Sequence, residues 1–358
     1  MDSLDSPDFF MRKIHSIEIR DDAHVGTARR AVHRFAEGLG FDENELAEID
    51  IVVQEIGTNA VRYAETSGWL HYTTPLGETQ GLELFYWDTG PGIYDLDRAI
   101  RDGVSTSGSL GAGLGAISRL MDEFDVYSTL HMPSRRSSAQ ARRTSHGTAL
   151  LARKWLNTKQ DETVGSNRAR NLGAWSRPHP GEEMNGDAYF VRTRKNLTLI
   201  AVVDGLGHGA GAKEASDAAL DSLDDWMGEP LDEVLHVAHN ALRATRGAVM
   251  SVAIIDRANE QISCAGVGNV MVRVFGVPEH VAPITTNGTL GARLGQLRVW
   301  TYPWAEGATL IMASDGVSAS WEMDSYPGIL RHSPQLLAGI LMRDYGRDTD
   351  DATVLVAR

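Results

Sequence analysis

The sequence has little cysteine and no long hydrophobic run, and both shortages narrow what the chain can be. Cys264 is the single cysteine among 358 residues, which excludes an internal disulfide and fits a reducing cytoplasm. The opening stretch MDSLDSPDFFMRK has no apolar segment of signal-peptide length. The longest apolar runs, such as LTLIAVV, are far too short to span a bilayer. We therefore expect a cytoplasmic protein without a membrane segment.

Positive charge is also scarce. The chain has 34 Lys and Arg against 48 Asp and Glu, a formal net charge of −14. Such a balance argues against nucleic acid or an anionic membrane as the partner. A hydrophobic content of 42% is enough for real cores, and a length of 358 residues favours two domains. The charge is compatible with a protein or a nucleotide–metal partner but identifies neither, and the chain as a whole is expected to be a globular α+β protein.

One polar stretch separates two parts of the chain that differ in their hydrophobic pattern. NTKQDETVGSNRAR, residues 157–170, has almost no apolar content and is typical of a linker. Before it, helical periodicity dominates; after it, short strand-like runs end in turns. The prediction is a tail over 1–12, a first domain over 13–157, a linker over 158–170 and a second domain over 171–358.

The stretch VVQEIGTNAVRYA, residues 52–64, places two polar side chains beside an apolar stripe. Glu55 and Asn59 are four residues apart, so on a helix they share one face. The stripe of the predicted helix over 42–65 consists of Leu46, Ile49, Val52, Val53, Ile56 and Ala60. Taken alone, such a pair is most often just part of a polar face. Motifs further along the chain indicate that the pair could instead belong to a ligand site.

An ATP site needs an acceptor for the adenine amino group, main-chain amides near the phosphates and an oxygen ligand for Mg²⁺. Asp88 directly follows the strand-like run LELFYW and can accept from that amine, whereas guanine presents a carbonyl there. Asn59 offers a side-chain oxygen to Mg²⁺. Glu55, one turn earlier, can orient or deprotonate an attacking hydroxyl.

Glycines supply the rest of this predicted pocket. In DTGPG, Gly90 and Gly92 leave the chain bare where a flat base approaches. GTAL then places Thr148 at the start of the closing strand. A Gly-rich lid over the phosphates is expected from GSLGAGLG, with Gly108, Gly111, Gly113 and Gly115.

In this order the motifs resemble the GHKL ATPase domain shared by histidine kinases and gyrase B. DGVSTSGSLGAGLGAISRLMDEF is especially similar to RsbT-type bacterial switch kinases, and less so to RsbW-type anti-sigma kinases. The resemblance covers about residues 13–157. It implies an α/β sandwich with helices on one face of a mixed sheet, ATP with Mg²⁺, Glu55 as base for serine phosphorylation and Asn59 as the Mg²⁺ ligand. The basic insertion over 133–146 departs from the family pattern, and we expect a solvated hairpin tip there more than a docking site.

Acidic residues in the second domain fall at the ends of strand-like runs. VVDGLGHG gives Asp204 and Gly205, MASDGV gives Asp315, and NGDAYF gives Asp187. DDAT, with Asp350 at its start, precedes the last strand. Any one DG is usually only a turn. Carboxylates delivered together to one edge of a sheet can instead hold two hard divalent cations.

These motifs resemble the PP2C-type serine/threonine phosphatases of the SpoIIE and RsbX branch, over residues 171–358. The resemblance implies an α-β-β-α sandwich and two Mn²⁺ or Mg²⁺ ions. It makes Asp204 the bridging and catalytic ligand, with the Gly205 carbonyl on one metal. Asp315 and Asp350 bind the second metal, Asp351 being the alternative to Asp350, and Asp187 holds a coordinated water.

Together the two resemblances predict a bifunctional regulator of bacterial partner switching. The kinase and phosphatase heads would act on a STAS-domain anti-sigma antagonist or scaffold protein, with a sigma factor or other switch protein as a further partner. The alternative is an ATP-dependent binding module with little kinase turnover, fused to an active phosphatase. Retention of Glu55 favours the kinase.

Overall fold

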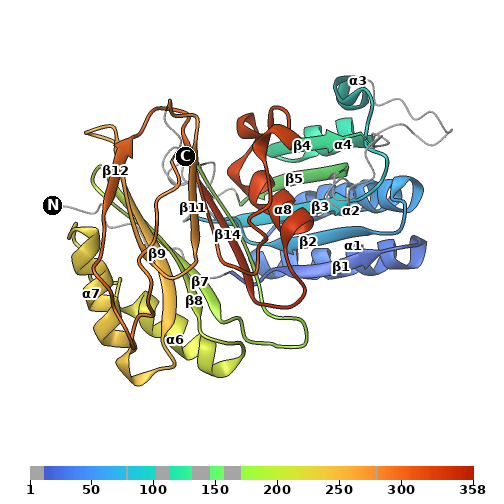
Figure 1. The fold of residues 1–358 in the computed structure, drawn as a ribbon. Coiled ribbons are helices and arrows are strands. Elements are labelled where there is room, and N and C mark those ends of the chain that lie inside the picture. The colour runs from blue at the N-terminus through green and yellow to red at the C-terminus, as the bar shows by residue number, and fades with distance from the viewer. Residues whose placement is uncertain (1–11, 78–79, 102–112, 131–145, 157–170, 279–280) are drawn as a thin grey trace, which may run out of the picture. The chain divides into compact units, whose positions relative to one another are not determined.

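The computed structural model describes residues 12–77, 80–101, 113–130, 146–156, 171–278 and 281–358, and it divides into two compact units (Figure 1). The N-terminal unit contains the described residues of 12–169 together with 322–344. The C-terminal unit contains those of 170–321 and 345–358. The predicted linker lies outside the described residues, as does the basic insertion apart from His146. The segment 322–344, placed by the sequence prediction in the second domain, packs with the N-terminal unit.

The N-terminal unit is one antiparallel sheet with helices on one face. The sheet has the strand order β1-β2-β3-β5-β4. The elements are β1 (His15–Ile19), α1 (Asp22–Leu39), α2 (Glu43–Tyr63), β2 (Gly68–Thr73), β3 (Gly81–Asp88), α3 (Leu96–Arg101), α4 (Gly113–Leu120), β4 (Glu123–Thr129) and β5 (Gly147–Trp155). Every pairing is antiparallel, so the expectation of a mixed sheet was wrong. The reason is that β5 lies between β3 and β4, and the two strands joined through α3 and α4 never become neighbours.

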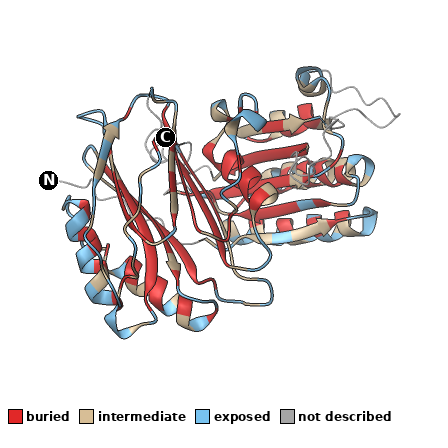
Figure 2. Ribbon diagram, in the orientation of Figure 1, coloured by how far each residue is buried: buried red, intermediate tan, exposed pale blue. Residues whose placement is uncertain are grey.

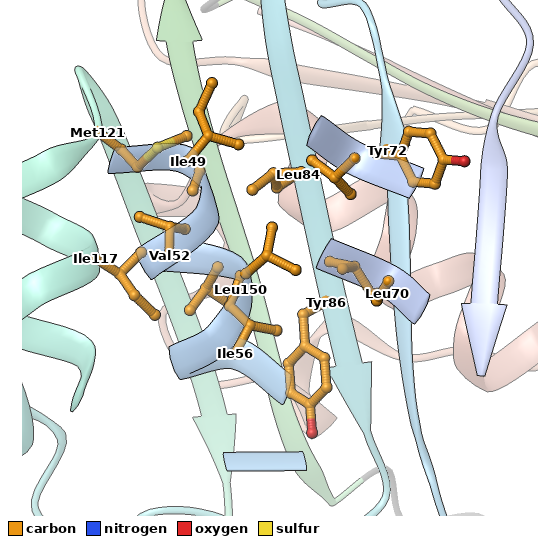
Figure 3. Packing of buried hydrophobic residues seen from close by; sticks show 14 of the residues in the cluster. Ile49, Val52, Ile56, Leu70, Tyr72, Leu84, Tyr86, Ile117, Met121 and Leu150 are labelled. Carbon is orange, nitrogen blue, oxygen red and sulfur yellow. The ribbon is translucent and has the colours of Figure 1, made fainter. Parts of the chain in front are cut away.

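Local sequence signals fix α2, the helix that carries the first candidate residues. Asp42 caps its N-terminus by accepting hydrogen bonds from the Asn44 and Glu45 amides, each at 2.9 Å. Glu45 Oε2 accepts in return from the Asp42 amide, which completes a capping box. The predicted apolar stripe is buried as expected, and Figure 3 shows Ile49, Val52 and Ile56 pointing toward the sheet. Because this stripe is fixed against the sheet, Glu55 and Asn59 are held at its edge.

Alternation along β3 gives the sheet two different faces. Leu84 and Tyr86 pack in the core beneath the helices, while Phe85 points to the opposite face and is nevertheless buried. The segment 322–344 covers this opposite face: the close approach at Gly339 leaves no room for a Cβ atom beside the Phe85 ring. The segment contains η3 (Met323–Ser325), η4 (Ile329–Arg331) and most of α8 (Pro334–Tyr345).

The C-terminal unit contains two antiparallel sheets, and their strands form its buried centre (Figure 2). One sheet has the order β12-β10-β9-β8-β7, and α6 and α7 pack against it. The other has the order β11-β13-β14-β6. The elements are β6 (Leu172–Arg177), β7 (Asp187–Arg194), β8 (Leu197–Gly205), α6 (Ala210–Asp221), α7 (Leu231–Ala241), η2 (Leu242–Ala244), β9 (Ala248–Asp256), β10 (Gln261–Val267), β11 (Met271–Phe275), β12 (Trp300–Pro303), β13 (Thr309–Ala313) and β14 (Ala352–Ala357). The predicted α+β class is confirmed. No helix within the described ranges is both long and apolar enough to cross a membrane.

Truncation of Ile56 tests the packing that positions α2. Ile56 is 1% exposed, so Ile56→Ala removes buried methyl groups and leaves a cavity, and we expect the free energy of unfolding to fall by about 2–5 kcal/mol. The matched control is Ile51→Ala on the same helix, where the side chain is 47% exposed. The control change is expected to stay within about 0.5 kcal/mol in urea denaturation. Equal losses for both variants would contradict the described packing of α2.

Candidate functional site

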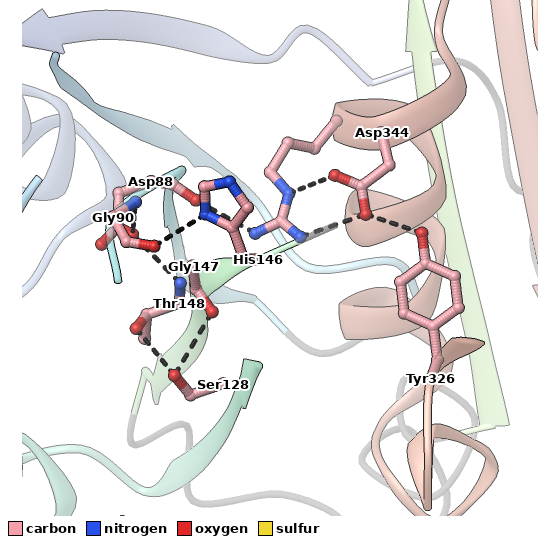
Figure 4. Close-up of polar contacts among 9 residues, drawn as sticks. Asp88, Gly90, Ser128, His146, Gly147, Thr148, Tyr326 and Asp344 are labelled. Atoms are coloured by element: carbon pink, nitrogen blue, oxygen red, sulfur yellow. Dashed lines mark hydrogen bonds and ion pairs between the residues drawn. The ribbon is translucent and has the colours of Figure 1, made fainter. Parts of the chain in front are cut away.

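Asp88 is the centre of the first candidate site. It is the last residue of β3 and is buried, with 7% of its surface exposed. Its Oδ1 atom accepts from the Gly90 amide at 2.8 Å and from the Thr148 amide at 3.1 Å (Figure 4). Its Oδ2 atom accepts from the Tyr86 hydroxyl at 2.8 Å. A carboxylate accepts about four hydrogen bonds, so these three leave it capacity for one more donor, such as an adenine amine.

Tyr86 was not predicted as a site residue. Burial, and then the neighbouring Asp88 carboxylate, raises the pKa of Tyr86 far above its ordinary value. The hydroxyl therefore keeps its proton and remains a donor to Asp88 Oδ2. A signal was available in the sequence, because residues two apart on a strand share one face and Tyr86 precedes Asp88 by two.

A small polar network continues from Asp88 along the ends of β4 and β5. Ser128 Oγ lies 3.1 Å from Thr148 Oγ1 and accepts from the Ile93 amide at 2.8 Å. His146 Nδ1 lies 3.0 Å from the Gly90 carbonyl oxygen. The turn after β3 is thus tied to the start of β5, and the Thr148 amide lies beside the Asp88 carboxylate.

The glycines of the DTGPG turn are required by the protein's own backbone. A Cβ atom on Gly90 would lie 2.5 Å from the Tyr63 carbonyl oxygen, at the end of α2. On Gly92, whose φ is +78°, it would lie 2.2 Å from the Thr129 carbonyl oxygen. The bare α-carbons therefore let this turn pack tightly against α2 and β4.

That packing sets the distance between Asp88 and the polar pair on α2. Tyr63 touches the Gly90 turn, and Asn59 lies one helical turn before Tyr63, with Glu55 one turn earlier again. Both side chains are half-buried. Among the residues that the structure describes, neither side chain forms a hydrogen bond or ion pair.

The predicted phosphate lid is only partly described. Gly113 and Gly115 begin α4, and a Cβ atom on Gly115 would lie 2.6 Å from the carbonyl oxygen of Ile100, near the end of α3. Gly108 and Gly111 lie outside the described residues. Gly115 thus allows α3 and α4 to meet, and the role of the other lid glycines stays a prediction.

The second candidate site lies where β7 begins and β8 ends. Asp187 and Asp204 are direct partners in the register of these strands. Asp187 is almost completely buried and accepts a hydrogen bond from Ser314 Oγ at 2.6 Å. Burial, and then the charge of Asp204, raises the pKa of Asp187 well above its ordinary range. Burial first, and then Asp315, Asp350 and Asp351, raises the pKa of Asp204 to about 7.

The remaining predicted residues are held around this pair. A Cβ atom on Gly205 would lie 2.1 Å from the Ala212 carbonyl oxygen, so only glycine fits there. Asp315 accepts from Asn269 Nδ2 at 2.8 Å. Asp351 accepts from the His179 amide at 2.7 Å. Asn269 and His179 donate hydrogen bonds to these carboxylates, and sequence reasoning missed both of them. No pattern near either residue in the chain points to the carboxylates.

The donor set suits hard divalent cations. All of its side-chain donors are carboxylate oxygens, the ligands preferred by Mg²⁺ and also suited to Mn²⁺. Among the described residues no three His, Cys, Asp or Glu side chains are already arranged as a metal site. Burial first, and then the charge of the neighbouring carboxylates, raises the pKa of both Asp187 and Asp204, so a cation among them would stabilise their charged forms.

Comparison with known proteins agrees with this division into two sites. The family model of the histidine kinase-like ATPase domain matches residues 20–132. The serine/threonine-protein kinase RsbT of Bacillus subtilis (strain 168) is 33% identical over 141 residues, which make up 39% of this chain and 95% of RsbT. The phosphoserine phosphatase RsbX of the same strain is 27% identical over 139 residues, 38% of this chain and 70% of RsbX.

A solved structure is also similar. It is described as "The bacterial stressosome: a modular system that has been adapted to control secondary messenger signaling". At 31% identity it covers 52% of this chain and 98% of its own, with a TM-score of 0.51. The two predicted resemblances, to a GHKL-type kinase and to a PP2C-type phosphatase on one chain, are confirmed.

Replacement of Asp204 by Asn tests the cost of burying this carboxylate among other acidic residues in the metal-free protein. An acid whose pKa rises from 3.8 to about 7 on folding binds its proton more tightly when folded, so the wild type loses stability as pH rises across this range. We expect Asp204→Asn to be more stable than the wild type by roughly 2 kcal/mol at pH 8 in chelator, an advantage that shrinks toward pH 4.

The control for this comparison is Asp221→Asn, an exposed aspartate at the end of α6, which should show no such pH dependence. Urea unfolding at several pH values measures all three proteins. Added Mn²⁺ is expected to stabilise the wild type and not Asp204→Asn. If Asp204→Asn is instead less stable than the wild type in chelator at pH 8, burial and the neighbouring carboxylates do not raise the pKa of Asp204 as described.

Proposed function

The chain belongs to the family of the serine/threonine-protein kinase RsbT, and on this premise we propose that it is a two-headed regulator of a bacterial partner-switching pathway. Its N-terminal head is an ATP-dependent protein serine/threonine kinase. Its C-terminal head is a metal-dependent phosphoserine and phosphothreonine protein phosphatase. The observation that carries the proposal is that one chain has both the half-buried Glu55–Asn59 pair next to the Asp88 turn and the crowded carboxylates around Asp204.

In the kinase head each role follows from the chemistry of the side chain. Asp88 accepts from the adenine amine with the capacity left by its three protein donors. Asn59 offers its side-chain oxygen to the Mg²⁺ that accompanies ATP. Glu55, one turn away on the same face of α2, takes the proton from the hydroxyl of the protein substrate.

In the phosphatase head the carboxylates would hold the metals. Asp204 at the end of β8 is paired with Asp187 at the start of β7. Asp315 and Asp350 are near enough to raise the pKa of Asp204. The Gly205 carbonyl is a further oxygen next to Asp204. Two Mn²⁺ or Mg²⁺ ions, when bound, would supply Lewis-acid activation of water and neutralise the phosphate being hydrolysed. Asp187, kept in place by Ser314, would orient the attacking water.

The proposed substrate is a STAS-domain antagonist or scaffold protein, and a sigma factor or other switch protein is a further proposed partner. The support comes from the similarity to RsbT and to a stressosome structure. With both heads on one chain, the phosphorylation level of a shared substrate would depend on the balance of the two rates.

A radiolabel-transfer experiment tests both heads at once. The wild type, Glu55→Gln and Asp204→Asn are incubated with [γ-³²P]ATP, Mg²⁺, Mn²⁺ and a STAS-domain protein. Glu55→Gln should reduce transfer by about 10²–10⁴-fold, the usual contribution of a general base. Asp204→Asn should let label accumulate, because loss of a bridging metal ligand stops hydrolysis. Glu37→Gln and Asp221→Asn, both exposed, serve as matched controls.

Each outcome of this experiment has a definite reading. Label that vanishes in Glu55→Gln and accumulates in Asp204→Asn supports two heads acting on one substrate. A different result is that neither the wild type nor any variant transfers label, although ATP binds and a phosphorylated partner is dephosphorylated. In that case the N-terminal unit is a nucleotide-dependent binding module. If transfer persists undiminished in Glu55→Gln, that residue is not the base.

A further inference from the structure

The segment 322–344 meets the N-terminal unit at three places. It lies far outside residues 20–132, the part that matches the ATPase family model. The three contacts involve β4, the middle of β3 and the end of β3, all on the sheet face opposite α1 and α2. They follow the segment in order along the chain, and the last of them reaches the candidate nucleotide site.

The first contact holds the start of α8 on β4. Asp125 accepts from the Ser333 amide at 2.7 Å, and its other oxygen lies 2.7 Å from His332 Nδ1. The Tyr127 ring packs edge-on against His332 with centroids 5.2 Å apart. The Tyr127 hydroxyl donates to the Pro327 carbonyl oxygen at 3.4 Å. The helix therefore begins at a fixed point of the sheet.

The second contact fixes how closely α8 approaches β3. A Cβ atom on Gly339 would lie 2.3 Å from the Phe85 ring, so the helix backbone rests directly on that ring. Phe85 is 1% exposed. Because β3 ends three residues later at Asp88, this contact directs the last turn of α8 toward the end of the strand.

The third contact joins α8 to Asp88 itself. Arg343 Nη1 donates to the Asp88 carbonyl oxygen at 3.1 Å. The remaining guanidinium nitrogens donate to Asp344, at 2.7 Å from Nε to Oδ1 and 3.1 Å from Nη2 to Oδ2. Asp344 in turn accepts from the Tyr326 hydroxyl at 2.7 Å (Figure 4). The Arg343 side chain is only 5% exposed, and its charge is paired with Asp344. Because Asp344 is held in turn by Tyr326, two residues of the same segment set the position of the guanidinium group.

We propose that Arg343 is a positioning residue for Asp88 and thereby helps select adenine over guanine nucleotides, an inference that rests on the proposed role of Asp88 in ATP binding. The carboxylate and the carbonyl of Asp88 share one α-carbon. Protein donors hold the carboxylate from one side of the strand end, and Arg343 holds the carbonyl from the other. With the carbonyl released, the strand end can rotate and the remaining acceptor position of the carboxylate turns away from the adenine amine.

Nucleotide selectivity distinguishes a residue that positions Asp88 from one that only stabilises the fold. A side chain that only stabilises the fold changes the affinities for adenine and guanine nucleotides together. A side chain that aims Asp88 changes their ratio, because adenine presents an amine donor to the carboxylate at the position where guanine presents a carbonyl oxygen. The test uses the full chain and isothermal titration with the non-hydrolysable analogues AMP-PNP and GMP-PNP in excess Mg²⁺.

The variants are Arg343→Met, Arg343→Lys, Asp88→Asn and the control Arg331→Met. Arg343→Met is expected to lower the AMP-PNP over GMP-PNP affinity ratio about fivefold to tenfold, which is the net contribution of one ordinary hydrogen bond. Arg343→Lys should fall between this variant and the wild type, since an ammonium group cannot hold Asp344 and the carbonyl in the same fork geometry. Arg331, exposed on the same segment, should leave the ratio unchanged.

The outcomes separate this inference from the proposed function. If Asp88→Asn abolishes the preference and both Arg343 variants retain it, Asp88 binds adenine but Arg343 does not position it. If Asp88→Asn keeps the wild-type ratio, the proposed role of Asp88 fails, and the inference fails with it. If Arg343→Met does not fold, an unchanged ratio in folded Arg343→Lys overturns the inference.

Discussion

The N-terminal unit depends on how one buried carboxylate is satisfied. Asp88 stands where β3 ends, and an unpaired carboxylate at that depth would cost several kcal/mol. The turn after β3, the start of β5 and the Tyr86 hydroxyl all supply donors to it. These donors can converge only because Gly90 lets the turn pack against the end of α2. The requirement to satisfy Asp88 thus brings α2, β3 and β5 together at one place.

The C-terminal unit shows the opposite electrostatic arrangement. Asp187 and Asp204 face each other across two strands with carboxylate neighbours and with burial that disfavours their charge. Among the described residues, no basic side chain forms an ion pair with Asp187 or Asp204 in the way that Arg343 pairs with Asp344. Such repulsion inside a fold favours cation binding, and under the proposed function a bound metal would restore the stability that the metal-free protein lacks. Asp88 is satisfied by the protein, whereas the Asp204 group is left for a ligand to satisfy.

The parts of the fold that sequence reasoning predicted correctly are those that depend on neighbours along the chain. The stripe from Leu46 to Ala60 follows from helical periodicity, and the end of β3 at Asp88 follows from an apolar run that meets a glycine-rich turn. Tyr86 shares a strand face with Asp88 and was within reach of the same reasoning. The roles assigned to Glu55, Asn59 and the metal carboxylates stay predictions.

The parts that sequence reasoning missed depend on residues far apart in the chain. The antiparallel sheet results from β5 entering between β3 and β4, which no local pattern specifies. The contact of Arg343 with Asp88 joins residues separated by 255 positions. A single sequence shows that α8 is apolar but gives no indication of which surface it covers.

The apolar character of α8 also determines what kind of change can occur at Arg343. Leu336, Leu337, Ile340 and Leu341 are all completely buried, and each such side chain contributes roughly 1.5–3 kcal/mol. A bound ligand typically shifts an equilibrium by about 1–3 kcal/mol, far less than their sum. We therefore expect nucleotide binding to leave the helix in place and to act on the hydrogen bonds at its end, where Arg343, Asp344 and Tyr326 make small, discrete contacts.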